Sequence, residues 1–116
     1  ASAAARALVR ERGVGVECCP VSNDRLGFMP LDRHPLPRFL EEGLLASIST
    51  DDPLLFGPFS VADTFAAVSG PLRLDREVEL RLARNAIATA FVTEDRRAQL
   101  AARFDAAVGG SSGAER

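Results

Sequence analysis

Two short apolar runs with one helical segment between them constrain the fold of this 116-residue chain more than any other feature. The runs are residues 14–19 and 44–49, and Pro35 can open a helix that continues to Glu42. A strand–helix–strand connection of this length joins parallel strands. Parallel strands are normally covered by helices on both faces and flanked by further strands. The sequence offers no third strand, so we expect a sector of a larger α/β protein.

The simplest architecture that meets this demand is a (β/α)8 TIM barrel, which typically takes about 250 residues. The predicted fold class is therefore α/β, a partial (β/α)8 barrel. Residues 1–108 are predicted to form the barrel sector. Residues 109–116 are rich in Gly and Ser and are predicted to be a disordered tail.

Helices are predicted on both sides of the strands. A first helix covers residues 3–12, with Gly13 just past its end. Three more helices follow the second strand, and each begins after a residue that can cap it. The cap and helix pairs are Ser60 with 61–69, Asp75 with 76–90, and Thr93 with 94–108. The segments 20–31 and 50–60 contain prolines and glycines and are predicted to be loops.

Composition excludes several classes of function. The formal net charge of -2 gives no basic surface for nucleic acid, and no apolar run approaches the roughly 20 residues of a membrane helix. The first six residues lack the features of a signal peptide, so a cytoplasmic location is expected. Cys18 and Cys19 are neighbours without a Cys/His cluster, which favours two reduced thiols over a structural zinc site.

Polar side chains follow both predicted strands. Ser22 and Asn23 come shortly after the first strand, and Asp51 and Asp52 come after the second. Functional sites of parallel α/β folds lie beyond the carboxyl ends of the strands, so both segments face one cleft if the strands are neighbours. Two interpretations of the aspartates remain open. They cap a turn or helix, or one binds a metal or a water while the other accepts a substrate hydrogen bond.

Other polar residues carry weaker signals, and a structural role is favoured for each. His34 is the only histidine, and no partner is placed for it by spacing, so local packing or capping is expected. Asn85 lies inside a predicted helix and either bonds to a loop or faces water. The remaining charged candidates are expected to be solvated. These are Arg25, Arg33, Glu41 and Glu42.

The order of motifs in this chain resembles the C-terminal third of the adenosine deaminase family. The motifs are Glu17-Cys-Cys-Pro-Val-Ser-Asn23, His34-Pro-Leu36 and Ser49-Thr-Asp-Asp-Pro-Leu-Leu-Phe-Gly57. The later Leu82-Ala-Arg-Asn-Ala86, Ala90-Phe91 and the final helix continue the resemblance, which runs from about residue 8 to about residue 108. Each motif is weak alone, and the combination is specific.

The resemblance implies a fold and a chemistry. Members of the family are metal-dependent (β/α)8 barrels that hydrolyse the 6-amino group of adenine nucleosides and related purines, with Zn²⁺ activating the attacking water. This chain would supply the last two strands with their flanking and C-terminal helices. By the resemblance, Asp51 is the metal-ligand aspartate and helps to orient the water, and Asp52 contacts N7 of the purine. Ser22, Asn23 and His34 fall in loop motifs around the site, without a direct chemical role.

The sequence lacks the other parts of such a site. In the family, the remaining metal histidines and the proton-shuttling glutamate lie on earlier strands, and a catalytic zinc usually has three protein ligands. We therefore expect a purine deaminase portion that is active only with the missing N-terminal barrel portion, as a covalent or a separate chain. Two alternatives stay open. One is a non-catalytic binding or regulatory module, and the other is the same chemistry on adenine or aminodeoxyfutalosine.

Overall fold

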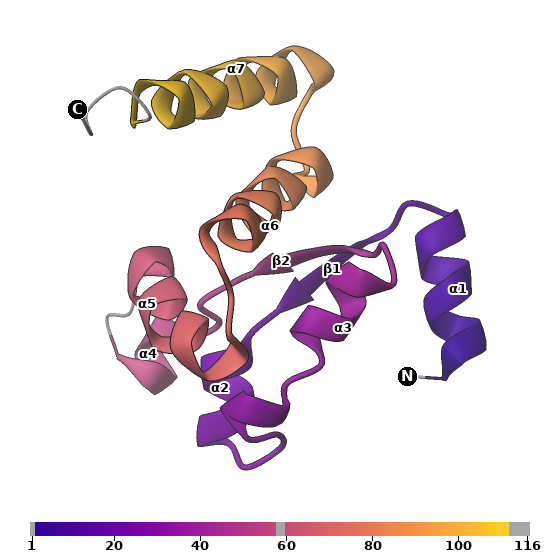
Figure 1. The fold of residues 1–116 in the computed structure, drawn as a ribbon, viewed down its shortest axis with the longest axis vertical. Helices are drawn as coiled ribbons and strands as arrows, with labels where there is room; N and C mark the ends of the chain where they lie inside the picture. Colours follow the sequence, from indigo (N-terminus) through magenta and orange to yellow (C-terminus); the bar gives the residue numbers. More distant parts are fainter. Residues whose placement is uncertain (1, 58–59, 112–116) are drawn as a thin grey trace.

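The computed structural model describes residues 2–57 and 60–111 as two short strands among helices (Figure 1). In chain order the elements are α1 (Ala3–Glu11), β1 (Gly15–Cys18), α2 (Pro20–Arg25), the 3₁₀ helix η1 (Leu31–Arg33), α3 (Leu36–Glu41), β2 (Leu45–Ile48), α4 (Pro53–Phe56), α5 (Val61–Leu72), α6 (Arg76–Thr89) and α7 (Glu94–Ser111). No helix in these two ranges is both long enough and apolar enough to cross a membrane.

The two strands pair in parallel, as the strand–helix–strand pattern predicts. The register runs from Gly15 opposite Leu45 to Cys18 opposite Ile48. A further backbone bond, from the Ser49 N–H to the Cys18 carbonyl at 2.8 Å, continues the ladder past β2. Each strand has one partner within the described ranges, so each keeps one edge without a strand beside it. The carboxyl ends of β1 and β2 therefore lie side by side.

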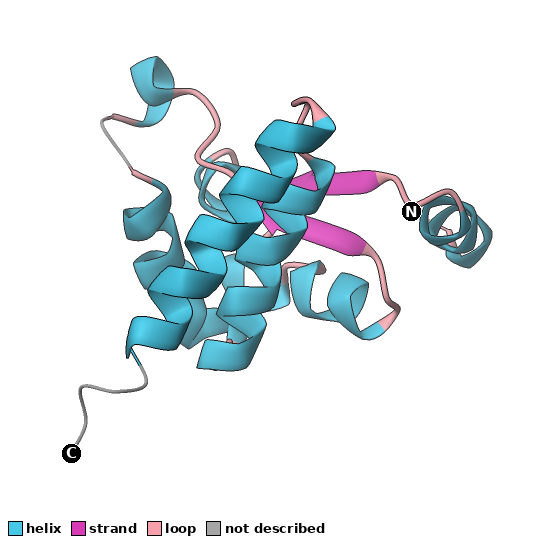
Figure 2. Ribbon diagram, turned by 90° about the horizontal axis from the view of Figure 1, so that it is seen from above, coloured by secondary structure: helices cyan, strands magenta, loops and turns pink. Residues whose placement is uncertain are grey.

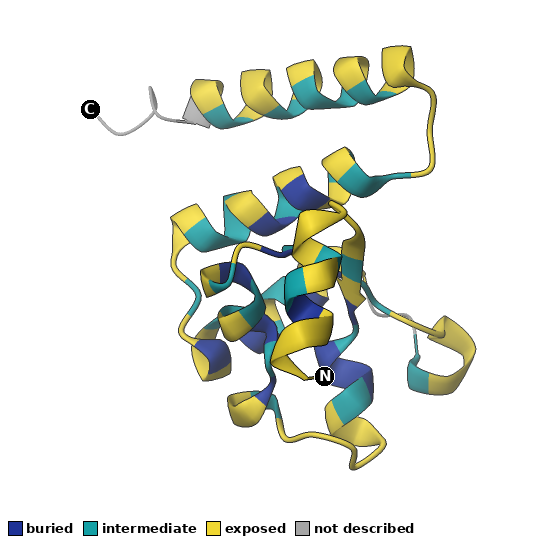
Figure 3. Cartoon of the chain, turned by 90° about the vertical axis from the view of Figure 1, so that its right-hand side faces the viewer, coloured by how far each residue is buried: buried dark blue, intermediate teal, exposed yellow. Residues whose placement is uncertain are grey.

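The hydrophobic core lies between the strands and the helices α3, α5 and α6. Its buried members come from all of these elements and from the start of α2. They are Cys18, Val21, Leu36, Leu40, Ala46, Ile48, Val68, Leu72 and Leu82. Figure 3 shows that buried residues gather in this part of the chain, whereas residues 94–110 of α7 are exposed or half-buried.

Helix α7 is attached to α6 rather than to the sheet, and Figure 2 shows the two helices beside each other. Arg97 in the first turn of α7 donates to the Ile87 and Ala88 carbonyls of α6. Arg84 of α6 makes two more contacts between the helices. The guanidinium donates to Asp105 at 3.1 Å and lies 5.2 Å from the centre of the Phe104 ring. Such exposed pairs add little stability each, so α7 is a peripheral layer.

Helix α6 is held close to the sheet by one buried polar contact and one glycine. Asn85 is buried, and its Nδ2 donates to the Ala46 carbonyl of β2 at 2.8 Å. The prediction of a loop partner or of water for Asn85 was wrong. At Gly15, an added Cβ would lie 2.7 Å from Thr89 Cβ, so only glycine permits this approach of α6 to β1.

All three predicted helix caps are present. The Ser60 side chain accepts from the Asp63 N–H at the start of α5, and Asp63 bonds back to complete a capping box. Asp75 accepts from the Val78 N–H at 2.9 Å, and Thr93 accepts from the Arg96 N–H at 3.4 Å. These contacts fix the starts of α5, α6 and α7.

Two segments predicted to be loops contain short helices. Pro20 opens α2 and Pro53 opens α4, because proline is tolerated in the first helical turn, where its missing N–H has no partner to lose. The tail was predicted to begin at residue 109, but α7 continues through Gly109 and Gly110 to Ser111. Two glycines disfavour a helix by about 1 kcal/mol each but do not end this one. Residues 112–116 lie outside the described residues.

Helix α1 is tied to the end of α3 by a carboxylate between two arginines. Arg6 is buried, and its Nε lies 2.5 Å from Glu42 Oε2, while Arg38 Nε lies 2.8 Å from Glu42 Oε1. The prediction of a solvated Glu42 was wrong, since its side chain is 30% exposed. Hydrogen bonds from Arg6 and then Arg38 lower the pKa of Glu42 from 4.5 to about 2.

We expect Asn85→Ala to lower the free energy of unfolding by about 1–3 kcal/mol, because it leaves the Ala46 carbonyl buried without its donor. Urea denaturation measures this difference. The control is Glu77→Gln on the exposed part of the same helix, which should stay within about 0.5 kcal/mol of the unchanged protein. Equal midpoints for both variants would contradict the structural role of Asn85.

We expect Glu42→Gln to destabilise the chain at neutral pH and to remove part of its acid sensitivity. The pKa of Glu42 is lower in the folded state, so its contribution is fully present above about pH 4.5 and is lost as the pH falls through about 2. Urea midpoints of the two proteins should therefore differ at pH 7 and converge near pH 2. Glu41→Gln, at the exposed neighbour, is the control and should show no such convergence.

Candidate functional site

The carboxyl ends of the two strands bring a serine and an aspartate together. Ser22 lies in α2, directly after β1, and Asp51 follows β2 by three residues. The Ser22 Oγ donates a hydrogen bond to Asp51 Oδ2 at 2.5 Å. Ser22 is 2% exposed, whereas Asp51 is exposed. The two segments therefore face each other at one edge of the sheet, as expected for neighbouring parallel strands.

Asp51 has an unusual backbone conformation. Its φ of 72° lies in the left-handed region, which aspartate tolerates better than most residues with a Cβ. A residue held there costs about 1–3 kcal/mol unless its surroundings stabilise it, and such residues cluster at functional sites. No described residue donates to the second carboxylate oxygen, Oδ1. Asp51 thus presents one bonded and one open oxygen.

Asp52 is a helix cap. Its Oδ1 accepts from the Leu54 N–H at 2.8 Å and starts helix α4, which confirms the capping interpretation for this residue. Asp52 is exposed, and no described residue donates to its Oδ2. Capping therefore uses one oxygen only. The two interpretations of the aspartate pair are compatible, because the other oxygen remains open to a ligand.

His34 is a buried packing residue, as predicted. Its Nδ1 accepts from the Leu36 N–H at 3.2 Å, so the proton of the neutral ring is on Nε2. That nitrogen lies 3.2 Å from the Asn23 amide, which pairs with it through the amide oxygen when the amide is turned accordingly. Burial lowers the pKa of His34 and keeps the ring neutral at pH 7. With both ring nitrogens bonded, His34 is not available as a metal ligand.

The two cysteines are free thiols. Burial, and then the neighbouring Cys19, raise the pKa of Cys18 to about 11. Burial, followed by the charges of Asp51 and Glu17, also raises the pKa of Cys19. Both side chains are therefore protonated at neutral pH, which disfavours a role as nucleophile.

Asp51 and Asp52 each present an open carboxylate oxygen in this cleft, and the family resemblance assigns Asp51 to the metal. Within the described part of the chain, no group of three or more His, Cys, Asp or Glu side chains could hold a metal ion. A catalytic zinc usually takes three protein ligands. The residues present fit one position of such a site, so the other ligands would have to come from elsewhere.

The arginines near the cleft differ from each other. Arg25 of α2 donates from Nη1 to the Phe56 carbonyl at 2.7 Å, which connects α2 to the end of α4. Arg25 is exposed, as predicted, and this backbone contact was not. Arg33 is exposed, as predicted. Sequence reasoning missed the Arg25 contact because its partner is a backbone carbonyl in a segment predicted to be a loop.

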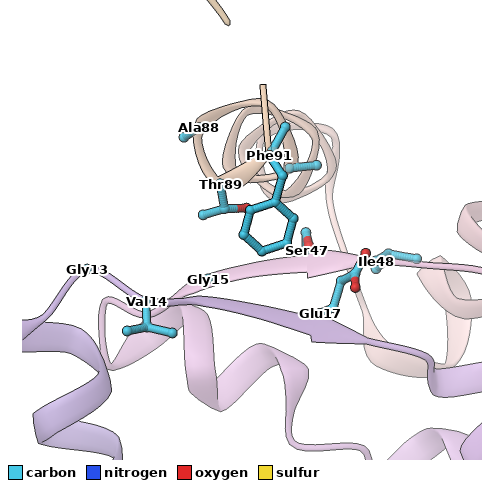
Figure 4. A pocket seen from close by; sticks show the side chains of 11 residues that line it. Gly13, Val14, Gly15, Glu17, Ser47, Ile48, Ala88, Thr89 and Phe91 are labelled. Carbon is cyan, nitrogen blue, oxygen red and sulfur yellow. The ribbon is translucent and has the colours of Figure 1, made fainter. Parts of the chain in front are cut away.

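A separate cavity of about 630 Å³ lies between β1, β2 and the end of α6. Its lining includes Val14, Glu17 and Ser47 but neither aspartate of the pair. Phe91, which follows α6, is fully exposed at 107% and points toward the strands beside this cavity (Figure 4). A large apolar ring with no cover is a typical contact for another protein segment.

A model of the adenosine deaminase family matches residues 3–107, and this chain belongs to that family. Its relatives include an adenine deaminase of Rhodopseudomonas palustris, 40% identical over 84% of this chain, and one of Streptomyces coelicolor, 42% identical over 87%. Each alignment covers 29% of the relative. The chain therefore spans about three tenths of the length of the curated relatives that it matches.

A solved structure supports the predicted architecture. The chain is similar to an adenine deaminase from Arthrobacter aurescens with a TM-score of 0.85 and 30% identity. The match covers 93% of this chain and 33% of that one. The prediction of a partial (β/α)8 barrel is confirmed, because the two-stranded parallel sheet and its helices superpose on part of a complete deaminase.

Proposed function

We propose that this chain is the C-terminal portion of a zinc-dependent hydrolytic purine deaminase, with adenine as the substrate. The active centre would be complete only when the rest of the barrel is present, in the same polypeptide or as a separate chain. One observation carries the proposal. Asp51 and Asp52 each keep an open carboxylate oxygen at the carboxyl end of the sheet, in a chain that matches the deaminase family over most of its length.

The two aspartates would have different roles. Oδ1 of Asp51 would coordinate a divalent cation, and Asp51 would orient the water that attacks the purine. Asp52 would accept a hydrogen bond from a protonated N7 through Oδ2. The chemistry that zinc supplies when bound is activation of water toward attack on the carbon that carries the amino group. This chain contributes the carboxylates and the rigid strand ends that hold them.

Adenine is favoured over adenosine by the relatives. The two relatives with 40% and 42% identity and the solved structure are all named adenine deaminase. Adenosine and aminodeoxyfutalosine share the same reacting ring and are the alternatives. A substrate panel distinguishes the three.

The need for a completing portion is supported by the surfaces left open. Each strand has one partner in the described ranges, although parallel strands are normally flanked on both edges. The cavity lined by β1, β2 and the end of α6 and the exposed ring of Phe91 are open as well. The site itself offers one metal ligand where three are usual.

The proposal is tested by combining this chain with the rest of the barrel and measuring zinc content and ammonia release. We expect bound zinc and turnover of adenine by the assembled protein, and neither from the 116 residues alone. Full activity of the isolated chain would refute the need for completion. An assembled protein that lacks both zinc and activity would favour the non-catalytic binding module.

We expect Asp51→Asn to lose both zinc and activity in the assembled protein, because the neutral amide is a poor ligand for the cation. Zinc is measured by mass spectrometry of the dialysed protein and activity by ammonia release. Asp24→Asn changes an exposed aspartate in the same region and serves as the control for the loss of one charge. Retention of zinc by Asp51→Asn would contradict the assignment of this ligand.

Two variants of Asp52 separate its cap from its substrate contact. Asp52→Asn keeps a good capping residue, whereas Asp52→Ala loses the cap and about 1 kcal/mol of stability. Both should lower kcat/KM for adenine by roughly 10- to 100-fold, the equivalent of a lost hydrogen bond to a charged group. Steady-state kinetics and urea denaturation of the assembled protein measure the two effects. Unchanged kcat/KM in Asp52→Asn would show that Asp52 is a cap only.

A further inference from the structure

We infer that Ser22 is a positioning residue for the metal ligand Asp51. Its hydroxyl holds one carboxylate oxygen and thereby leaves the other, Oδ1, directed to a divalent cation. The inference rests on the proposed function, since it takes Asp51 to be a metal ligand. It goes beyond that function because it gives a role to a residue that is neither a ligand nor a substrate contact.

The hydrogen bond from Ser22 to Asp51 occupies one oxygen of the carboxylate. The 2.5 Å between Ser22 Oγ and Asp51 Oδ2 falls in the range of hydrogen bonds from a hydroxyl to a charged carboxylate, about 2.5–2.7 Å. A serine hydroxyl has one hydrogen to donate, and this one is used on Asp51. Oδ2 is therefore engaged before any cation arrives, which favours binding through a single oxygen.

Ser22 and Asp51 differ in burial and in backbone conformation. Ser22 is 2% exposed and follows Pro20 and Val21, which are also buried, so its position is fixed by the core. Asp51 is exposed and has a left-handed backbone outside any strand or helix. Without the bond, nothing described holds the carboxylate in one rotamer. Ser22 is thus the rigid side of the pair.

The carboxylates of Asp51 and Asp52 are held by different kinds of hydrogen bond. The Leu54 N–H holds one oxygen of Asp52, and that bond is local to the start of α4. The bond on Asp51 spans 29 residues and joins the ends of two strands. Groups that hold a metal-binding carboxylate in this way commonly change metal affinity when they are removed.

The chain contains a matched control for removing such a bond. Ser69 of α5 donates to Glu79 Oε1 of α6, also at 2.5 Å and also in a partly buried place. The same hydroxyl also lies 2.8 Å from the Phe65 carbonyl, so Ser69→Ala deletes this contact together with the hydroxyl–carboxylate bond, without touching the strand ends. A general effect of the lost bond on folding should therefore be similar in both variants.

The test measures zinc affinity by chelator competition in the assembled protein, with Ser22→Ala, Ser22→Thr and Ser69→Ala. We expect roughly 10- to 100-fold weaker zinc binding in Ser22→Ala, restored affinity in Ser22→Thr, which keeps the hydroxyl, and unchanged affinity in Ser69→Ala. Circular dichroism checks the fold. If Ser22→Ala does not fold, Ser22→Val replaces it, since Val has the shape of the Thr in Ser22→Thr without its hydroxyl.

Three results would overturn the inference, and all of them differ from a failure of the proposed function. Unchanged affinity in Ser22→Ala, or equal weakening in Ser22→Ala and Ser69→Ala, would show that the hydroxyl does not position the ligand. Equal loss in Ser22→Ala and Ser22→Thr would do the same. Absence of zinc from the unmodified assembled protein would instead refute the proposed function.

Discussion

The parallel pairing of β1 and β2 is the interaction on which the rest of the structure depends. Its register sets Cys18 beside Ile48 and so brings the segments after both strands to one edge. A shift by one residue would turn every strand side chain to the opposite face and would separate Ser22 from Asp51. The bond between these two residues is therefore a consequence of the register and also a check on it.

The same pairing explains how the helices are arranged. Asn85 can reach the Ala46 carbonyl only because Gly15, on the neighbouring strand, lets α6 approach. This contact lies away from the carboxyl edge and fixes α6 against the sheet without using the cleft. Stability and chemistry are thus placed at different parts of the strand pair, as is usual in barrels whose loops at one end carry the site.

Local signals in the sequence predicted the strands, the three caps and the packing of His34. These local signals failed where a side chain has a partner far away in the sequence, and where a proline can either break or open a helix. Glu42 looked solvated because Arg6, its strongest partner, is 36 residues away. Proline breaks a helix in its interior but can open one in its first turn. The helices α2 and α4, which Pro20 and Pro53 open, were therefore not predicted. The role of Ser22 needed the register of two strands, which no local pattern gives.

Under the proposed function, the cation would join this chain to the rest of the barrel. Asp51 would supply one ligand and the rest of the barrel would supply the others, so zinc would bind the assembled form more tightly than either part. Linkage then requires that zinc stabilise the assembly by the same free energy with which assembly strengthens zinc binding. The open strand edges would provide backbone hydrogen-bonding groups for that assembly, and Phe91 would provide an apolar contact; neither depends on the metal. Chelation of the zinc should therefore weaken the association of the two parts without unfolding the strand pair.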